Sequence, residues 1–246
     1  MNRLVRLVIR NVRATIPVSI LVSTLLLPIL IFLFMGLSYT ELIPPFIISG
    51  KEISYLAFLA AGVIAMTAVE SSLASGSSFW IDRAYGLMDQ ILVGPFTKTD
   101  YLLSKVITSM LVGLASCGLI GLLAIPTLSS ISIVGFFIVL AAAVSGSLLF
   151  GVFAIILSSY VKSEGSFNAI INLLFIVLMF TSSTFFPLDL VPEAFRFVFL
   201  ANPLTYVADI IRYGLFNAST ATLLLEGVIL FSELIVVLVV LRLKFK

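Results

Sequence analysis

The sequence predicts an all-α integral membrane protein with six transmembrane helices. Of its 246 residues, 61% are apolar and 11% are charged, which leaves too little polar surface for a soluble globule. An uncharged run also extends from Val106 to Val161, interrupted by one turn-forming stretch at 126–130. A helix needs about 20 apolar residues to cross the hydrocarbon layer, where only helices and closed barrels satisfy every backbone group. Two spanning helices joined by a tight turn therefore account for this run.

Charged residues divide the chain, read as one membrane domain (1–246), into six apolar segments. If the N-terminus is inside, eleven of the fourteen basic residues fall on the cytoplasmic side, and Lys51, Arg196 and Arg212 fall outside. Basic residues concentrate in cytoplasmic segments, so we expect both termini in the cytoplasm. The chain then crosses the plasma (cytoplasmic) membrane several times. The predicted spans cover residues 16–37, 54–79, 105–126, 131–158, 167–186 and 221–241.

Residues 1–15 interleave Arg3, Arg6, Arg10 and Arg13 with aliphatic side chains. This pattern is typical of an amphipathic helix that lies along the inner membrane surface. A cluster of positive charges that only orients the first span explains the same residues. Both interpretations stay open at this point.

Residues 79–104 connect the second and third predicted spans on the cytoplasmic side. Met88, Ile91 and Leu92 recur at helical spacing among charged residues, which predicts a short amphipathic helix. We expect such a helix to be offered to a soluble partner protein.

Residues 187–217 lie on the outer side, where Pro187, Pro192 and Pro203 divide them into pieces too short to cross the bilayer. The pieces are nevertheless rich in large apolar side chains such as Phe195 and Phe197, which an ordinary solvated loop would not carry. We therefore expect short re-entrant helices that pack against protein, where freed backbone groups find partners.

The residues that are missing exclude several functions. Histidine is absent, which removes histidine-activated nucleophiles and histidine metal sites, and the single cysteine, Cys117, cannot form a cysteine metal cluster. The only Gly-Lys pair, Gly50-Lys51, has Pro45 where a phosphate-binding loop needs its first glycine. We expect no catalytic, cofactor-binding or metal-binding residue on this chain, and no nucleic acid partner.

Two carboxylates lie inside predicted spans, where ionisable groups are costly and count as functional candidates. Glu233 is near the middle of the last span, and Glu70 lies in the second span beside a polar stripe that includes Ser71 and Ser75. These residues suit the wall of a transport pathway or a cation or proton site. A protonated or helix-bonded carboxyl that only supports packing is the alternative.

Two groups of residues in the connecting segments complete the pattern. The cytoplasmic group is Arg83-Ala84-Tyr85-Gly86-Leu87-Met88-Asp89, then Leu92-Val93-Gly94-Pro95 and Lys105. The outer group is Phe186-Pro187, Pro192, Asn202-Pro203-Leu204-Thr205-Tyr206 and Arg212. In this order, on six spans, the chain resembles the membrane subunits of type-2 ABC exporters, which include drug, lipid and polysaccharide export permeases. It departs from the family pattern at Leu87 (usually threonine), Asp89 (usually glutamate) and Ser104 (usually glycine).

The resemblance implies a permease that works in a lipid membrane as a pair, with a second copy or a paralogue. A separate ABC ATP-binding subunit would hold ATP and Mg²⁺, dock on the 79–104 loop and hydrolyse the ATP, so this chain would not itself be an enzyme. The substrate expected is hydrophobic or amphiphilic, with a lipid-linked glycan as an alternative. The coupling residues implied are Arg83, Gly86, Met88, Asp89, Pro95 and Lys105, and those of the path or gate are Glu70, Ser71, Ser75, Glu233, Phe186, Pro187, Phe197, Asn202 and Pro203.

A different functional class fits the missing ATP-binding loop directly. A stand-alone secondary transporter or channel would use Glu70 and Glu233 as coupling sites. It leaves the cytoplasmic motif and the broken apolar outer segment unexplained.

Overall fold

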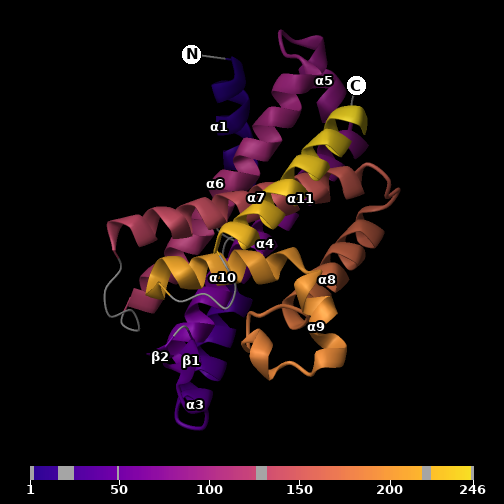
Figure 1. The fold of residues 1–246 in the computed structure, drawn as a ribbon. Coiled ribbons are helices and arrows are strands. Elements are labelled where there is room, and N and C mark those ends of the chain that lie inside the picture. The colour runs from indigo at the N-terminus through magenta and orange to yellow at the C-terminus, as the bar shows by residue number, and fades with distance from the viewer. Residues whose placement is uncertain (1–2, 16–24, 49, 126–131, 218–222, 245–246) are drawn as a thin grey trace.

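The computed structural model describes residues 3–15, 25–48, 50–125, 132–217 and 223–244. It is a helical bundle built around α4 (Tyr55–Ala84), which is buried along most of its length. α4 packs against α6 (Lys98–Ala124), α7 (Ile133–Ser158) and α10 (Pro203–Phe216). Both chain ends lie at the end of the molecule that carries α5 (Leu87–Val93), and a small hairpin lies at the opposite end (Figure 1).

Local capping explains where the helices begin. The hydroxyls of Ser54, Ser132 and Ser163 accept hydrogen bonds from the first turns of α4, α7 and α8 (Glu164–Phe180). α6 begins with a reciprocal pair in which Thr97 and Asp100 each bond the other's backbone N–H, both at 3.1 Å. These residues can be recognised in the sequence because a cap acts only on its own helix.

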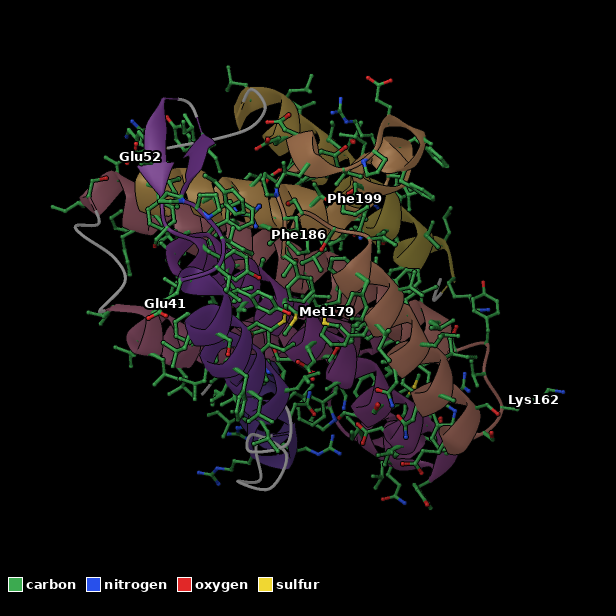
Figure 2. The ribbon with its side chains drawn as sticks, turned by 90° about the horizontal axis from the view of Figure 1, so that it is seen from below. Glu41, Glu52, Lys162, Met179, Phe186 and Phe199 are labelled. Carbon is green, nitrogen blue, oxygen red and sulfur yellow. The ribbon has the colours of Figure 1, made fainter. Side chains whose placement is uncertain are left out.

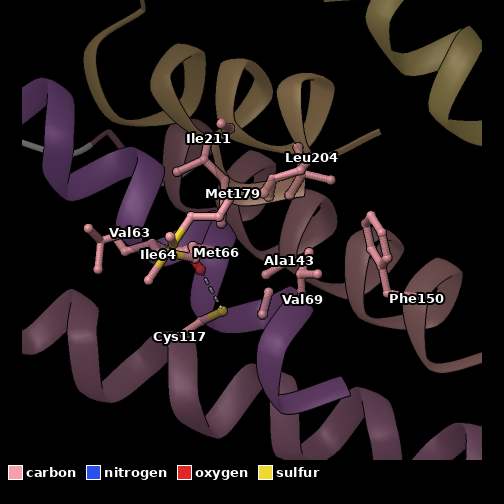
Figure 3. Packing of buried hydrophobic residues seen from close by; sticks show 14 of the residues in the cluster. Val63, Ile64, Met66, Val69, Cys117, Ala143, Phe150, Met179, Leu204 and Ile211 are labelled. Carbon is pink, nitrogen blue, oxygen red and sulfur yellow. Dashed lines mark hydrogen bonds between the residues drawn. The ribbon is translucent and has the colours of Figure 1, made fainter. Parts of the chain in front are cut away.

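Small residues bring the backbones of the bundle close together. A Cβ on Gly62 of α4 would clash with the carbonyl of Thr184, and one on Gly113 of α6 would clash with Ser147. Cys117 of α6 donates a weak hydrogen bond to the carbonyl of Ile64 at 3.4 Å, inside the apolar core shown in Figure 3. This close approach replaces the hydrophobic driving force that helices lack within lipid.

The first described elements confirm helices at both predicted positions. α1 (Arg3–Thr15) packs against α6 and buries Leu7 and Asn11, while its placement on the membrane surface stays a prediction. The next helix runs over Leu25–Thr40 and contains the π-helical turn Ile31–Met35, followed by α3 (Gly36–Thr40). The first half of the predicted span 16–37 lies outside the described residues.

A β-hairpin departs from the all-α prediction. β1 (Phe46–Ile48) pairs antiparallel with β2 (Lys51–Ile53), and Gly50 adopts the left-handed φ of 76° in the turn. Lys51 Nζ donates to the carbonyl of Phe216 at 2.9 Å, so the hairpin is tied to the end of α10. Each strand has only three residues, too few for an alternation of polar and apolar side chains to stand out, so the sequence did not predict the hairpin.

Four described helices are long and apolar enough to cross a membrane, and a fifth span results if the bent pair α9–α10 is counted as one. The four are α4, α6, α7 and α11 (Leu223–Lys244). The predicted span at 167–186 corresponds to α8, which ends at Phe180 and has only 17 residues. A mostly helical membrane protein is thus confirmed, and the count of six spans stays a prediction.

The second and third membrane helices are longer than the spans predicted for them. α4 continues to Ala84 and α6 already begins at Lys98, so the two helices project beyond the spans predicted at 54–79 and 105–126. Only residues 85–97 connect them, and α5 is the short helix expected there. The turn predicted at 126–130 lies outside the described residues.

The segment 187–217 contains a 3-10 turn (Leu188–Leu190), α9 (Glu193–Leu200) and α10, and the chain bends by 85° between α9 and α10. The protein packing expected for this segment is found in α10, which is largely buried. It is not found in α9, none of whose residues is buried in this chain. Composition shows that a segment is apolar but not whether protein or lipid covers it.

Candidate functional site

The helix α5 lies within the connection between α4 and α6, residues 85–97. Gly86 begins it with a left-handed φ of 69°, a conformation that a residue with a side chain rarely adopts. Met88 and Ile91 rest on a small apolar cluster formed by α4, α6, α7 and α11, while Asp89 and Pro95 are exposed. One face of α5 is therefore seated on the bundle and the other is free.

Arg83 does not point toward the free face of α5. Its Nη1 donates to the carbonyl of Ser159 at 2.7 Å and its Nη2 to that of Val161 at 3.1 Å. Trp80 Nε1 donates to the same Val161 carbonyl at 3.0 Å. Arg83 and Trp80 thus hold the C-terminal end of α7 against the end of α4, where a basic group is favourable.

A buried polar cluster surrounds Asp82 at the base of the α5 loop. Lys105 Nζ lies 2.8 Å from Asp82 Oδ2 and donates to Ser78 Oγ at 2.7 Å. Tyr101 donates its hydroxyl proton to Asp82 at 2.9 Å, and Arg10 of α1 lies 3.6 Å away. Lys105 therefore forms an ion pair inside the bundle. Asp82 was missed as a site residue because its partner lies on another helix.

The polar stripe of α4 is internal. Ser71 is 1% exposed and donates to the carbonyl of Thr67 at 2.6 Å. Ser75 is 3% exposed and lies close to Gly151 of α7. A serine that bonds its own helix is compatible with packing alone. Within a single chain, neither residue lines an open pathway.

The structure does not join Glu70 and Glu233 into one site. Each has a buried carboxyl oxygen, Oε2, without a hydrogen-bond partner among the described residues. Glu233 lines a cavity of about 410 Å³ between α7, α8 and α11, together with apolar residues and Pro203. Glu70 lies on α4 and is not among the residues that line this cavity.

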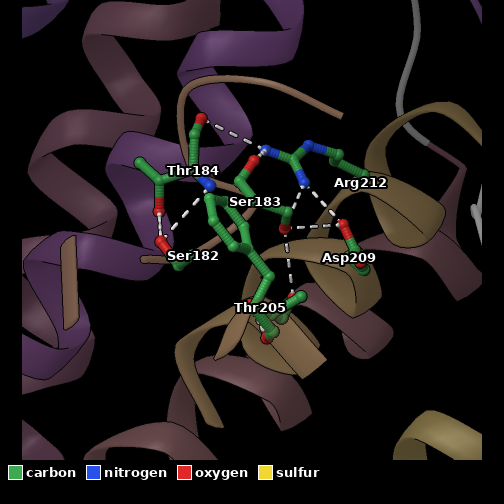
Figure 4. Close-up of polar contacts among 7 residues, drawn as sticks. Ser182, Ser183, Thr184, Thr205, Asp209 and Arg212 are labelled. Atoms are coloured by element: carbon green, nitrogen blue, oxygen red, sulfur yellow. Dashed lines mark hydrogen bonds and ion pairs between the residues drawn. The ribbon is translucent and has the colours of Figure 1, made fainter. Parts of the chain in front are cut away.

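Arg212 lies at the centre of a buried polar cluster (Figure 4). It is 1% exposed, and its guanidinium bonds Asp209 Oδ1 at 2.5 Å, Ser183 Oγ at 3.0 Å and the Thr184 carbonyl at 3.2 Å. Its guanidinium carbon also lies 3.7 Å from the ring centroid of Phe58. Arg212 belongs to the predicted motif, but Asp209 was not predicted as a site residue. Asp209 lies three residues before Arg212 on the same helix, a spacing at which opposite charges commonly pair.

Asn202 and Pro203 form the corner between α9 and α10. Asn202 Oδ1 caps α10 by accepting from Leu204 N–H at 3.0 Å, and its Nδ2 donates to the carbonyl of Leu178 at 2.7 Å and to Thr181 Oγ1 at 3.0 Å. Pro203 occupies the first turn of α10, where its missing N–H costs nothing. The Asn-Pro pair therefore starts one helix and fixes it to the end of another.

The remaining predicted gate residues differ in exposure. Pro187 is buried, Phe186 is 45% exposed and Phe197 is 69% exposed. Phe186 and Phe199, both labelled in Figure 2, line an apolar cavity of about 380 Å³ together with Met35. The cavity lies between the helix Leu25–Thr40 and α9. Phe197 does not line this cavity.

Residues 3–216 match a family model described as "ABC-2 type transporter". The chain belongs to this family. The match includes α1, the α5 loop and α10, so both candidate regions lie inside the part of this ABC-2 chain that the family shares. The resemblance noted from the two motifs is therefore confirmed.

The ABC-2 chain is also similar to three curated proteins that share one name. It is 28% identical over 202 residues to a protein from Cyanophora paradoxa named "Putative transport permease ycf38", covering 78% of this chain and 67% of that protein. A protein of the same name from Pyropia yezoensis is 26% identical over 200 residues, covering 78% and 66%. A third, from Porphyra purpurea, is 25% identical, and the chain spans 56% of its length. This ABC-2 chain is a component of a membrane transporter.

Proposed function

We propose that this chain is the membrane-spanning subunit of an ATP-driven exporter of the plasma membrane. A separate ABC ATP-binding subunit would hold ATP and Mg²⁺ and dock on α5, and the permease would work with a second copy or a paralogue. The observation that carries the proposal is that α5 is accessible and yet held in place. It has no buried residue, but Gly86 and the apolar cluster under Met88 and Ile91 give it a defined position.

The surroundings of α5 support transmission of a movement into the bundle. The Asp82 cluster joins α1, α4 and α6 directly below it, and Arg83 joins α4 to the end of α7. A partner that closes on ATP can bias the permease only through contacts that differ between two arrangements. An exposed helix seated on joined helices meets this requirement, because pushing it moves several spans together.

Two apolar features support a hydrophobic or amphiphilic substrate. The cavity lined by Phe186 and Phe199 has mostly aromatic and aliphatic walls. Next to it, α9 exposes Phe195, Phe197 and Leu200, which a second permease chain or lipid must cover. A route between paired chains would then pass apolar walls on the outer side.

Co-purification with an ABC ATP-binding subunit from the same genome tests this proposal. We expect Asp89→Lys combined with Val93→Asp to abolish binding and stimulation of ATP hydrolysis, because both side chains lie on the free face of α5. The matched control is Lys162→Glu, which reverses an exposed charge in the connection between α7 and α8, next to the Val161 carbonyl that Arg83 bonds. Normal binding and stimulation by the double variant would rule out α5 as the docking element.

A secondary transporter or channel remains the second candidate, favoured by the unpartnered carboxyl oxygens of Glu70 and Glu233. That function predicts substrate movement in vesicles that contain this chain alone and an ion gradient, with loss in Glu70→Gln and Glu233→Gln. The exporter predicts no movement without the ATP-binding subunit and ATP. The two measurements separate the classes.

A further inference from the structure

A groove between α6 and α11 opens at the end of the bundle that carries α5 and both chain ends. Its volume is about 460 Å³. Lys98 and Thr99 of α6 and Arg242 of α11 form its polar rim, and Leu102, Val106 and Leu241 are among the apolar residues beneath. The rim thus combines two cations from helices that are far apart in the sequence.

The two cations are not neutralised within the described part of the chain. Lys98 and Arg242 are both exposed, and neither takes part in the ion pairs found among the described residues. Three other basic groups at this end are engaged: Lys105 pairs with Asp82, Arg83 bonds carbonyls just after α7, and Lys244 lies over the Tyr160 ring at 3.6 Å. The groove therefore presents positive charge that is available to an anion.

The apolar part of the groove indicates what kind of anion fits. Leu103 is 47% exposed and Leu238 is 40% exposed at its walls, while Val106 and Leu241 are buried in its floor. An inorganic anion or an acidic protein surface would leave these leucines uncovered. The positive-inside rule places this end at the inner leaflet, where basic pockets between spanning helices bind anionic headgroups.

We propose that this groove binds one anionic phospholipid of the inner leaflet, with its headgroup between Lys98 and Arg242 and an acyl chain along Leu103 and Leu238. The site adjoins the coupling region. Val106 and Leu241, which form the floor of the groove, belong to the same apolar cluster on which Met88 and Ile91 of α5 rest. A bound lipid would therefore support the cluster that positions α5.

Native mass spectrometry of the full chain released from nanodiscs of phosphatidylcholine and phosphatidylglycerol tests the binding. We expect wild-type protein to retain phosphatidylglycerol preferentially. Retention should fall by about tenfold or more in Lys98→Ala combined with Arg242→Ala, because each basic group near an anionic lipid contributes several-fold. The matched control, Arg6→Ala with Lys162→Ala, removes two exposed cations outside the groove and should retain the lipid.

Two further arms identify the ligand. Leu238→Trp should fill the acyl part of the groove and lower lipid retention while both cations remain, and Lys98→Arg with Arg242→Lys should keep it. Inorganic phosphate should not displace the lipid from wild-type protein. Displacement by phosphate would show a simple anion site and overturn the proposal.

Unchanged retention in the Lys98→Ala, Arg242→Ala variant would also overturn it. The proposal would also fail if this variant retained the lipid but no longer bound the ATP-binding subunit. Lys98 and Arg242 would then contact a protein and not a lipid. The lipid measurement uses the permease alone. Its outcome is therefore independent of whether the proposed export function holds.

Discussion

Asp82 of α4 and Lys105 of α6 form a buried ion pair, with Lys105 Nζ 2.8 Å from Asp82 Oδ2 and side chains that are 8% and 3% exposed. Tyr101 and Ser78 bond the same two groups, so each charge has more than one polar partner. The pair joins the end of one long helix to the start of the next, and the α5 loop leaves from these two ends. A rigid base for α5 follows from this contact.

Removing one partner of this ion pair should destabilise the protein more than removing both partners. We expect Lys105→Met to destabilise the protein by about 3 kcal/mol, because it removes the nearer cation of the buried Asp82 carboxylate and leaves only Arg10, 3.6 Å away. Lys105→Met combined with Asp82→Leu should cost clearly less, since no buried carboxylate then remains and the Arg10 side chain, 38% exposed, can reach solvent. Thermal unfolding in detergent compares the variants. Equal losses in the single and double variants would contradict a coupled pair.

The contact of Gly62 with Thr184 predicts a position-specific cost. Gly62→Ala should destabilise the bundle by about 1–3 kcal/mol, because the added methyl meets a backbone carbonyl that cannot rotate away. Gly121→Ala is the matched control. This glycine also lies in a long helix, with no described atom of another element within 4 Å, so alanine should be neutral or stabilising by up to about 1 kcal/mol. Similar melting temperatures for the two variants would show that the close approach does not exist.

The placement of the two ends of the bundle predicts a labelling pattern. Cysteines at Ser163 and Glu52, both exposed, should react with a membrane-impermeant reagent from opposite sides, with Ser163→Cys reacting from the cytoplasm. Cys117 is buried and should give little background. Labelling of whole cells and of inverted vesicles provides the measurement. Reaction of both positions from the same side would refute this arrangement.

Because α9 is exposed in the single chain, a charge introduced there should affect assembly or export and not folding. Phe197→Asp should leave the isolated chain folded in detergent, because this side chain is 69% exposed, but should impair export once lipid or a second chain must cover α9. Leu204→Asp, at a fully buried position of α10, should prevent folding through an unpaired buried carboxylate. Size-exclusion profiles and a transport assay compare the two. A misfolded Phe197→Asp chain would mean that α9 is buried after all.

Local and compositional properties were predictable from the sequence. The apolar segments that become α4, α6, α7 and α11, the short helix α5, and the family were all identified without coordinates. Hydropathy and capping act within a few turns of one helix, so neighbouring residues already contain this information. The resemblance to the family was also noted from short motifs of this local kind.

Contacts between distant segments were decided only by the tertiary structure. The resemblance implies coupling roles for Arg83 and Lys105, and the structure adds that Arg83 bonds the end of α7 and that Lys105 pairs with Asp82 on another helix. Ser71 suits a pathway wall by its sequence position, and the structure adds that its side chain is buried within the single chain. The direction of a side chain and the identity of its neighbour depend on how helices rotate and cross when they pack. A pattern along one chain specifies which residues are polar, whereas only packing determines which polar groups meet.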